Sequence, residues 1–408
     1  MSLCLFLTTV LHLALVPLAI QTGGTDRAAS TAQASSVAYT SGTAYTGAKS
    51  SCKDPFKGSG PLQFSTRGWQ TDWCKHSVPY NDFTSGGPAR DGIPPIDAPK
   101  FVSVDVANSW IEDREPVIAL EVNGETRAYP LQILTWHEIV NDEIGGTPVT
   151  VTFCPLCYTA IVFKRPEHGG RTLTFGTTGN LRNSDLVMWD RQTESWWQQF
   201  SGEAIVGTLL GEKLEKIVAP LVSWKEFRDR YPTAQVLSRD TGHSRSYGQN
   251  PYVGYDDASK PPWLYNGPVG DALRPMERVI GVEIGSEVRA SLLTDVRREK
   301  ALHDDVAGSS IVIFWTKHAA SALDRKEIGD SKRIGSIGVY ETNVDRHELT
   351  FREKGGLFVD SETGSKWNIF GEAVEGPLKG RKLNPVVHHN TFWFVWGAFQ
   401  DPGTLQKR

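Results

Sequence analysis

The sequence predicts a β-rich α+β fold, made of two homologous tandem units that follow a disordered N-terminal leader. Three observations predict this: a long internal repeat, strand-like runs separated by turn residues, and a polar low-complexity stretch near the N-terminus. A chain of 408 residues is long enough for two units with their own cores. The 39 glycines suit a turn-rich β protein, and most of the 13 tryptophans are expected in the core.

The internal repeat is the strongest of the three observations. The run VIALEVNGETRAYPLQIL, which begins at Val117, recurs 162 positions later as VIGVEIGSEVRASLLTDV, which begins at Val279. Downstream, the segment from Asp190 matches the segment from Asp360, with Asp, Thr, Ser, Trp, Phe and Gly in the same order. Self-similarity of about 140 to 160 residues indicates two related domains or half-barrels, not a short-period solenoid. The predicted parts are repeat unit 1 over residues 101–240, a Tyr/Gly-rich connector over 241–270 and repeat unit 2 over 271–408.

Three further segments are predicted before the repeat. Residues 1–22 are a predicted signal peptide or membrane anchor, because Leu3 to Ile20 is apolar except for two threonines and one histidine. Residues 23–60, rich in Ser, Thr, Ala and Gly, are a predicted low-complexity linker, and residues 61–100 are an N-terminal extension. We therefore predict an extracytoplasmic protein, secreted or periplasmic, that contacts a membrane only through an uncleaved N-terminal segment.

The charge of the chain is nearly balanced, with 47 acidic and 43 basic residues and no basic stripe. A nucleic-acid partner is therefore not expected. The sequence also contains no G-x-S-x-G elbow, P-loop or H-E-x-x-H motif, which gives hydrolase functions little support. A small molecule or a metal ion is therefore the kind of ligand that remains possible.

Four of the five cysteines lie beyond the apolar N-terminal segment, which contains Cys4. An even number of cysteines in an oxidising compartment favours disulfides. Cys52 and Cys74 flank a stretch rich in Pro, Gly and aromatic residues, and they are predicted to form a structural disulfide. The other two belong to the motif Cys154-Pro155-Leu156-Cys157.

The elements before this motif can be predicted from turn and helix signals. Val117–Val122 and Thr126–Tyr129 are expected to form a hairpin, because Asn123-Gly124 between them is a strong turn signal. Pro130 suits the first turn of a helix, which is expected to end before Gly145-Gly146. The residues at roughly helical spacing along it are Leu131, Leu134, Glu138 and Val140.

The Cys-x-x-Cys motif itself is predicted to lie on a tight turn between two strands. Val149–Phe153 is expected to form the strand before it and Ala160–Phe163 the strand after it. β-branched Ile161 and Val162 argue against a helix at this point. His137, on the preceding helix, could reach the turn.

Four kinds of chemistry fit two cysteines on such a turn. A thiol–disulfide oxidoreductase would use the first cysteine as a thiolate of lowered pKa, although those enzymes usually place the pair at a helix N-terminus. A metal site would use both thiolates and needs further ligands, of which His137 is the first candidate and His168, Asp185 and His243 are weaker ones. Substrate-linked thiol chemistry and a structural disulfide are the other two. The cofactor of a metal site is predicted to be a transition metal, zinc or copper.

The repeat helps to choose among these alternatives. His137, Cys154 and Cys157 have no counterparts of the same type in repeat unit 2. The residues at the corresponding positions are Glu299, Thr316 and Ala319. Joint loss of all three is expected if they work together, so we predict that Cys154, Cys157 and His137 form one catalytic or metal-binding site in repeat unit 1.

Two polar segments are predicted to line this site. Residues 176–185 form a predicted loop rich in Gly, Thr and Asn, with Arg182 and Asp185 as candidate binding residues. In the connector, tyrosine hydroxyls and acidic groups could bind a ligand or a cation. The candidates there are Tyr247, Tyr252 and Asp256. Turn capping in the loop and packing of tyrosines across the junction would explain the same residues without a ligand.

The run TWHEIVNDEIGGTPVTVTFCPLCYTAIVFKR, followed by FGTTGNLRNSDLVMWDRQTESWWQQFSGEAI and YGQNPYVGYD, resembles family 3179 of the domains of unknown function. The resemblance covers roughly residues 100–402. It implies a mostly bacterial, extracytoplasmic protein in which His137, Cys154 and Cys157 stand at motif positions of the family. It implies no settled activity.

The sequence therefore supports two hypotheses of different classes. The first is an exported protein with a Cys-x-x-Cys/His site for metal binding or thiol redox chemistry; as an enzyme, it would be a metal- or thiol-dependent oxidoreductase. The alternative is a non-catalytic extracytoplasmic ligand-binding module, in which the Cys-x-x-Cys pair is a structural disulfide and the aromatic loops bind the ligand. Neither hypothesis names a substrate.

Overall fold

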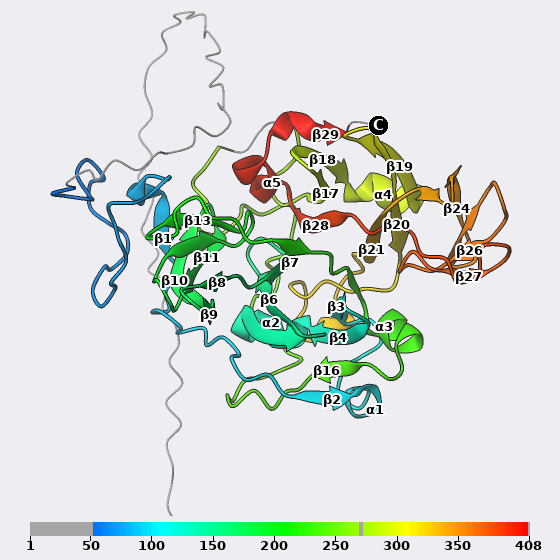
Figure 1. Cartoon of the computed structure of the whole chain (residues 1–408), viewed down its shortest axis with the longest axis horizontal. Helices are drawn as coiled ribbons and strands as arrows, with labels where there is room; N and C mark the ends of the chain where they lie inside the picture. The colour runs from blue at the N-terminus through cyan, green and yellow to red at the C-terminus, as the bar shows by residue number, and fades with distance from the viewer. Residues whose placement is uncertain (1–51, 269–271, 407–408) are drawn as a thin grey trace, which may run out of the picture. The chain divides into compact units, whose positions relative to one another are not determined.

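The computed structural model describes residues 52–268 and 272–406, and the chain forms one compact unit from Cys52 onward (Figure 1). The predicted signal peptide or anchor and most of the predicted linker lie outside these residues. Strands dominate the described part, which confirms the predicted β-rich class. No helix within the described ranges is long and apolar enough to cross a membrane.

The first sheet is built around the predicted hairpin. β3 (Pro116–Val122) and β4 (Glu125–Pro130) pair antiparallel around Asn123-Gly124, where Asn123 adopts the positive φ of 50° that suits this turn. The strand order in this sheet is β15–β3–β4–β16–β2. Its other strands are β2 (Phe101–Ser103), β15 (Leu221–Ser223) and β16 (Gln235–Leu237).

The helix after this hairpin is shorter than the sequence predicts. α2 spans Leu131–His137, with Pro130 as its N-cap, and Glu138 ends it with a φ of 59°. The chain continues as β5 (Ile139–Ile144), so Val140 lies in a strand and not on the helix. β-branched residues favour a strand, and burial of β5 against its neighbour outweighs the helical spacing that continues into it.

The Cys-x-x-Cys motif lies on a turn between two strands, as predicted. β6 (Thr147–Cys154) and β7 (Thr159–Lys164) pair antiparallel, and Cys154 is the last residue of β6. The strand order of this sheet is β14–β7–β6–β5, with β14 at Lys216–Ile217.

The predicted loop over residues 176–185 is instead a strand and a turn. β10 (Phe175–Arg182) pairs with β11 (Asp185–Asp190), so the loop prediction is wrong. A register shift between Thr177 and Leu181 accommodates the glycines and interrupts the alternation that normally identifies a strand. The strand order of this sheet is β1–β10–β11–β12–β13. Its other strands are β1 (Phe83–Ser85), β12 (Trp196–Gln198) and β13 (Glu203–Val206).

The N-terminal extension packs on this last sheet. Cys52 and Cys74 form the predicted disulfide. Next to it, an aromatic cluster joins Phe64 and Tyr80 of the extension to the buried Trp196 of β12, with the Phe64 and Trp196 rings 5.3 Å apart. The disulfide therefore closes a segment whose aromatic side chains are part of a core.

The second half of the unit contains three further sheets, with strand orders β28–β17–β18–β29, β19–β20–β21 and β24–β25–β26–β27. It begins with a hairpin, β17 (Arg278–Ile284) and β18 (Glu287–Leu292), followed by α4 (Leu293–Glu299). The remaining strands of these sheets are β19 (Ala301–Val306), β20 (Ser309–Thr316), β21 (Ser336–Glu341), β24 (Phe351–Lys354), β25 (Leu357–Asp360), β26 (Lys366–Trp367), β27 (Ala373–Glu375), β28 (Val387–Phe392) and β29 (Leu405–Gln406).

Short elements complete the described structure. The other α-helices are α1 (Val104–Ala107), α3 (Trp224–Arg230) and α5 (Trp393–Phe399). Two small hairpins are formed by β8 (Glu167–His168) with β9 (Arg171–Thr172) and by β22 (Asn343–Val344) with β23 (His347–Glu348). Single 3-10 turns lie at Tyr80–Asp82, Ile328–Asp330 and Pro402–Thr404.

The two halves of the unit share a core. β28 lies beside β7 (Figure 1). β15 lies beside β21. One large cluster of buried residues contains Leu120 and Cys154 from the first half and Trp393 from the second. The Cys-x-x-Cys turn therefore lies at the junction of the halves.

Candidate metal centre

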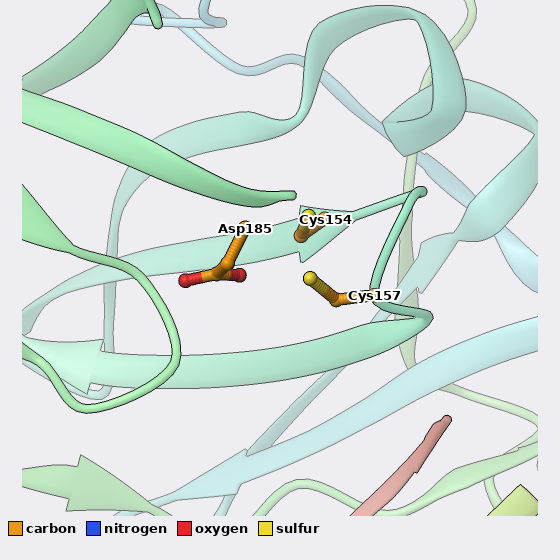
Figure 2. Close-up of side chains that lie close together, drawn as sticks. All are labelled: Cys154, Cys157 and Asp185. Atoms are coloured by element: carbon orange, nitrogen blue, oxygen red, sulfur yellow. The ribbon is translucent and has the colours of Figure 1, made fainter. Parts of the chain in front are cut away.

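The candidate site lies where two hairpin turns meet. One is the β6–β7 turn with Cys154 and Cys157, and the other is Asn183-Ser184, after which Asp185 begins β11. Figure 2 shows the side chains of the two cysteines and Asp185 close together. Their ligand atoms, two Sγ atoms and one carboxylate oxygen, all lie within 4.8 Å of one another. The structure thus brings together three predicted site residues from two separate hairpins.

Both cysteines are free thiols in the structure, and both are buried. The carbonyl oxygen of Ser184 lies 3.9 Å from Sγ of Cys154 and 3.5 Å from Sγ of Cys157, which links the two turns. Burial raises the pKa of each thiol, and the nearby Asp185 carboxylate adds to the effect. Without a cation beside them, the thiols are therefore held in the protonated form at neutral pH.

Asp185 is fully buried, and its two oxygens have different surroundings. Oδ2 accepts hydrogen bonds from Nε2 of Gln198 at 2.6 Å and from the backbone N–H of Phe200 at 2.9 Å. Oδ1 accepts no hydrogen bond of normal geometry within the described ranges, and the two thiols beside the carboxyl lower its pKa only in part. Burial raises the pKa of this carboxyl to about 6. A buried carboxylate oxygen without a partner is unfavourable, so Oδ1 is the atom of Asp185 that is available to bind a cation.

A chain of hydrogen bonds supports Asp185 through its Oδ2 atom. Gln198, which donates to Asp185, accepts from Nη1 of Arg182 at 3.3 Å. Arg182 also contacts Asp82, with Nε 3.4 Å from Oδ2. Outer contacts of this kind orient metal ligands. Arg182, a predicted binding residue, therefore lies one residue away from the cluster and supports it.

Residues with left-handed backbone conformations gather at this place. Tyr158, directly after Cys157, has a φ of 57°, and the turn residues Asn183 and Ser184 have φ values of 53° and 64°. Asn183 and Ser184 form a two-residue hairpin turn that needs positive φ at both positions. Tyr158 ends a turn that its own N–H closes by donating to the carbonyl of Pro155 at 3.2 Å, so its left-handed conformation belongs to the hairpin loop that carries the cysteines.

His137 lies outside the cluster and has other partners. A carbonyl oxygen can only accept, so Nδ1 of His137 donates to the carbonyl of Pro94 at 2.7 Å, and Nε2 accepts from the hydroxyl of Tyr247 at 2.6 Å. Tyr247 accepts in turn from the hydroxyl of Thr241 at 2.6 Å. Burial lowers the pKa of His137 to about 4, which keeps the ring neutral. The structure thus pairs two predicted site residues, His137 and Tyr247, with each other and not with the cysteines.

The connector packs over the cluster. The hydroxyl of Tyr255 donates to the carbonyl of Leu156, inside the motif, at 2.9 Å. Ser184 Oγ donates to the carbonyl of Trp263 at 2.6 Å. Tyr252 packs against the core cluster that contains Cys154. Burial, followed by the charges of Glu138 and Cys154, raises the pKa of its hydroxyl.

Asp256, another predicted binding residue, has a structural environment. It forms a buried ion pair with Arg278, with Oδ2 2.7 Å from Nη2, and a second one with Lys332 at 3.1 Å. Arg278 also lies over the ring of Tyr158, 3.8 Å from its centroid. Asp256 therefore joins the connector to the second half and is neutralised there.

Three residues near the cluster were not predicted as site residues: Gln198, Tyr255 and Glu138. Glu138 is 7% exposed, and burial, followed by the charge of Asp185, raises its pKa to about 8. One signal could have identified it, because it follows His137 directly and its position in the predicted repeat holds a lysine, Lys300. Gln198 carries no comparable signal, since glutamine is common on strand surfaces.

A cavity of about 270 Å³ lies elsewhere at the junction, between β3, β21 and β28. Its wall includes Glu121, Tyr231, Glu372, Lys382 and His388. None of the predicted site residues lines it. The charged groups in it are already paired, because Lys382 Nζ lies 3.0 Å from Glu372 and 3.4 Å from Glu121.

The fold and the cluster define a β-rich protein with a buried thiol–carboxylate group at the junction of its two halves. The chain belongs to the family described as Protein of unknown function (DUF3179), whose family model matches residues 90–403. This confirms the resemblance seen in the sequence, and the matched range contains all three residues of the cluster. Comparison with the curated proteins gave no match, and comparison with the solved structures gave none.

Proposed function

We propose that this chain is an exported protein with a transition-metal centre held by Cys154, Cys157 and Asp185. The observation that carries the proposal is the buried Oδ1 of Asp185, which has no partner in the described part of the chain and belongs to a group of ligand atoms within 4.8 Å of one another. An ion between these atoms would bind this oxygen and both thiolates, and it would satisfy all three at once.

Two thiolates and one carboxylate favour zinc or copper. Zinc binds thiolate sulfur at about 2.3 Å and carboxylate oxygen at about 2.0–2.2 Å, so ligand atoms around one ion lie within the observed spacing. Copper also accepts thiolate ligands. Magnesium and calcium prefer all-oxygen sites, which makes them poor candidates.

Dithiol exchange receives less support from the same residues. A thiol–disulfide oxidoreductase needs an accessible thiolate of lowered pKa. Cys154 and Cys157 are 1% and 0% exposed, and burial raises the pKa of both. A bound cation reverses this effect, because it replaces the thiol protons and stabilises the thiolates.

Export to an oxidising compartment is part of the proposal. The Cys52–Cys74 disulfide is compatible with such a compartment, where disulfides form and persist. The apolar character of residues 1–22 supports the same conclusion.

We further propose that the two halves descend from one duplicated unit, of which only the first kept the centre. Matching hydrogen bonds support this. Nε1 of Trp197 donates to Asp190 at 2.9 Å, and Nε1 of Trp367 donates to Asp360 at 2.9 Å. Beside each pair, a threonine and a serine hydroxyl lie 2.7 Å apart. Both halves also contain the succession hairpin, seven-residue helix and antiparallel strands.

The metal proposal is tested by metal analysis of the full chain purified without chelator, combined with thiol titration. We expect about one equivalent of zinc or copper per chain, and two thiols that become titratable only after metal removal. Cys154→Ser, Cys157→Ser and Asp185→Asn should each lose most of the metal. Asp185→Asn is the most informative of the three, because asparagine keeps an acceptor for Gln198 and Phe200 while it removes the charge.

Two matched variants serve as controls. Asp240→Asn changes an exposed carboxylate, and His137→Ala changes the histidine that is hydrogen-bonded to Pro94 and Tyr247. Both should retain the metal. A wild-type protein with no bound metal and no affinity for added zinc or copper would sink the proposal, and so would a disulfide between Cys154 and Cys157 that resists reduction in the folded protein.

A further inference from the structure

Glu138 is a buried carboxylate whose surroundings give it no partner. It is 7% exposed, and its side chain makes no hydrogen bond or ion pair with any residue in 52–268 or 272–406. Its backbone is fixed, because its N–H donates to the carbonyl of Leu134 and its carbonyl accepts from the N–H of Phe153, both at 2.8 Å. The position of the Glu138 backbone next to the end of β6 is therefore set by α2 and β6, and the side chain is left free to serve a ligand.

The backbone conformation of Glu138 does not require a carboxylate. Lys300, which ends α4 as Glu138 ends α2, has nearly the same dihedral angles, with φ of 61° and ψ of −28° against 59° and −32°. The side chain of Lys300 is paired with Glu353. A lysine with a partner fits this position as well as a glutamate does. The backbone conformation therefore does not explain why position 138 holds an unpartnered carboxylate.

That explanation lies in the neighbouring cluster. The N–H of Phe153, the residue directly before Cys154, donates to the carbonyl of Glu138 at 2.8 Å, which places Glu138 beside the cysteine turn. In agreement with this position, the charge of Asp185 adds to burial in raising the pKa of Glu138. Glu138 is nevertheless not among the residues whose ligand atoms lie within 4.8 Å of one another. It is thus close to the proposed centre but outside the set of direct ligands.

Charge decides whether Glu138 binds the ion directly or holds another ligand of the ion. Two thiolates, the Asp185 carboxylate and a divalent ion together carry one negative charge. A fourth anionic ligand would add another in a buried setting, which is strongly unfavourable. A neutral fourth ligand is therefore preferred, and water is the neutral ligand that a nearby carboxyl can hold by a hydrogen bond.

We propose that the fourth position of the centre is a water molecule, and that Glu138 is the residue that positions it. This inference rests on the metal centre proposed above. Three protein ligands and one water are typical of zinc sites that activate water, whereas structural sites have four protein ligands. The three ligand residues are 0–1% exposed, so Glu138, at 7%, is the member of the group that solvent reaches most easily.

The test uses the full chain loaded with cobalt(II), whose visible spectrum reports the number and type of its ligands, and neutral imidazole as an uncharged ligand that displaces water. We expect thiolate-to-cobalt bands in the wild type and a change in the ligand-field bands when imidazole is added. Glu138→Gln keeps the size of the side chain, so it should still bind cobalt, but its apparent imidazole affinity should change at least several-fold. Glu143→Gln, an exposed carboxylate in β5, is the matched control and should follow the wild type.

The outcomes separate the two proposals. Absence of cobalt binding in the wild type would overturn the metal centre itself, and this inference with it. Cobalt binding with a spectrum that imidazole does not change would show a closed centre and overturn the inference alone. The same holds if imidazole changes the spectra of wild type and Glu138→Gln at equal concentrations, because Glu138 would then not touch the exchangeable ligand.

Discussion

At the scale of single residues, the two oxygens of Asp185 have separate tasks. Oδ2 is held by Gln198 and by the backbone of Phe200, and Oδ1 is left without a partner in the described structure. Because Gln198 is itself held by Arg182, the plane of the carboxylate is fixed before any ion arrives. Preorganisation of this kind is what outer residues contribute to a metal site.

Gln198→Ala tests this preorganisation. The substitution removes the side-chain donor to Oδ2 but keeps the backbone donor of Phe200, so the folded protein should still bind metal with an affinity lower by about 10- to 100-fold. Competition with a chromophoric chelator measures this affinity. Gln235→Ala changes an exposed glutamine of β16 and should leave it unchanged. Equal affinities in wild type and Gln198→Ala would show that Gln198 does not orient Asp185.

His137 gives a second prediction at this scale, which concerns pH. Burial lowers its pKa from the ordinary 6.5 to about 4. Between these two pH values the imidazole is therefore protonated in the unfolded state and neutral in the folded state. The stability that neutral His137 contributes is therefore fully present above pH 6.5 and is lost as the pH falls toward 4. Relative to His137→Gln, the wild type should lose about 3 kcal/mol of unfolding free energy across this range.

Urea unfolding at several pH values measures this difference. His168→Gln, at an exposed position in the β8–β9 hairpin, is the control and should run parallel to the wild type. A constant difference between wild type and His137→Gln from pH 7 to pH 4 would contradict the hydrogen-bonded, neutral form of His137.

At the scale of elements, local signals predicted turns well and predicted element ends poorly. Asn123-Gly124 identified the β3–β4 hairpin because this dipeptide itself adopts the turn. The end of α2 was missed, since Glu138 leaves the helix only because β5 pairs with β6, a contact that no local pattern contains. The sequence does not predict β10 for the same kind of reason. Its glycines are typical of a loop, and only the pairing with β11 makes the segment a strand.

In the candidate site, too, local sequence predicts some residues, and tertiary contacts bring in the others. The two cysteines are adjacent in sequence and could be predicted together with the turn that carries them. Asp185 reaches them only because two hairpin turns meet through Ser184, and in the sequence it was one of several weak ligand candidates. The sequence favours His137 because it lies one element before the cysteines and is absent with them from repeat unit 2, yet its partners, Pro94 and Tyr247, come from distant segments.

The N-terminal extension provides a prediction at this scale. Cys52 and Cys74 close a loop with a sequence separation of 22, which also holds aromatic residues of a core cluster. The double variant Cys52→Ser/Cys74→Ser should be destabilised by about 3 kcal/mol, because the unfolded extension gains conformational freedom. Chemical unfolding followed by tryptophan fluorescence measures this. Metal content should remain at the wild-type level, and its loss would show that the extension shapes the centre.

At the scale of the whole molecule, the Cys-x-x-Cys turn is bonded to both halves. The carbonyl of Cys157 accepts from Oγ1 of Thr391 at 3.0 Å and from the N–H of Phe392 at 3.4 Å, both in β28. The next residue, Tyr158, accepts with its hydroxyl from the N–H of Ala322 at 3.0 Å. An ion that fixes this turn would therefore also fix the contact surface of the second half.

Metal binding should consequently slow amide hydrogen exchange in residues far from the centre. At a free zinc concentration of 100 times its dissociation constant, binding only to the folded state adds about 2.7 kcal/mol to the unfolding free energy. Because the turn bonds to β28, amide hydrogen exchange should slow in β28 and in its neighbour β17, as well as in β6, β7 and β11. Cys157→Ser with the same zinc is the control and should show no change in any of them. If amide exchange slowed only in β6, β7 and β11, the centre would stabilise only the first half of the unit. The bonds from the turn to Thr391 and Phe392 would then not couple the two halves.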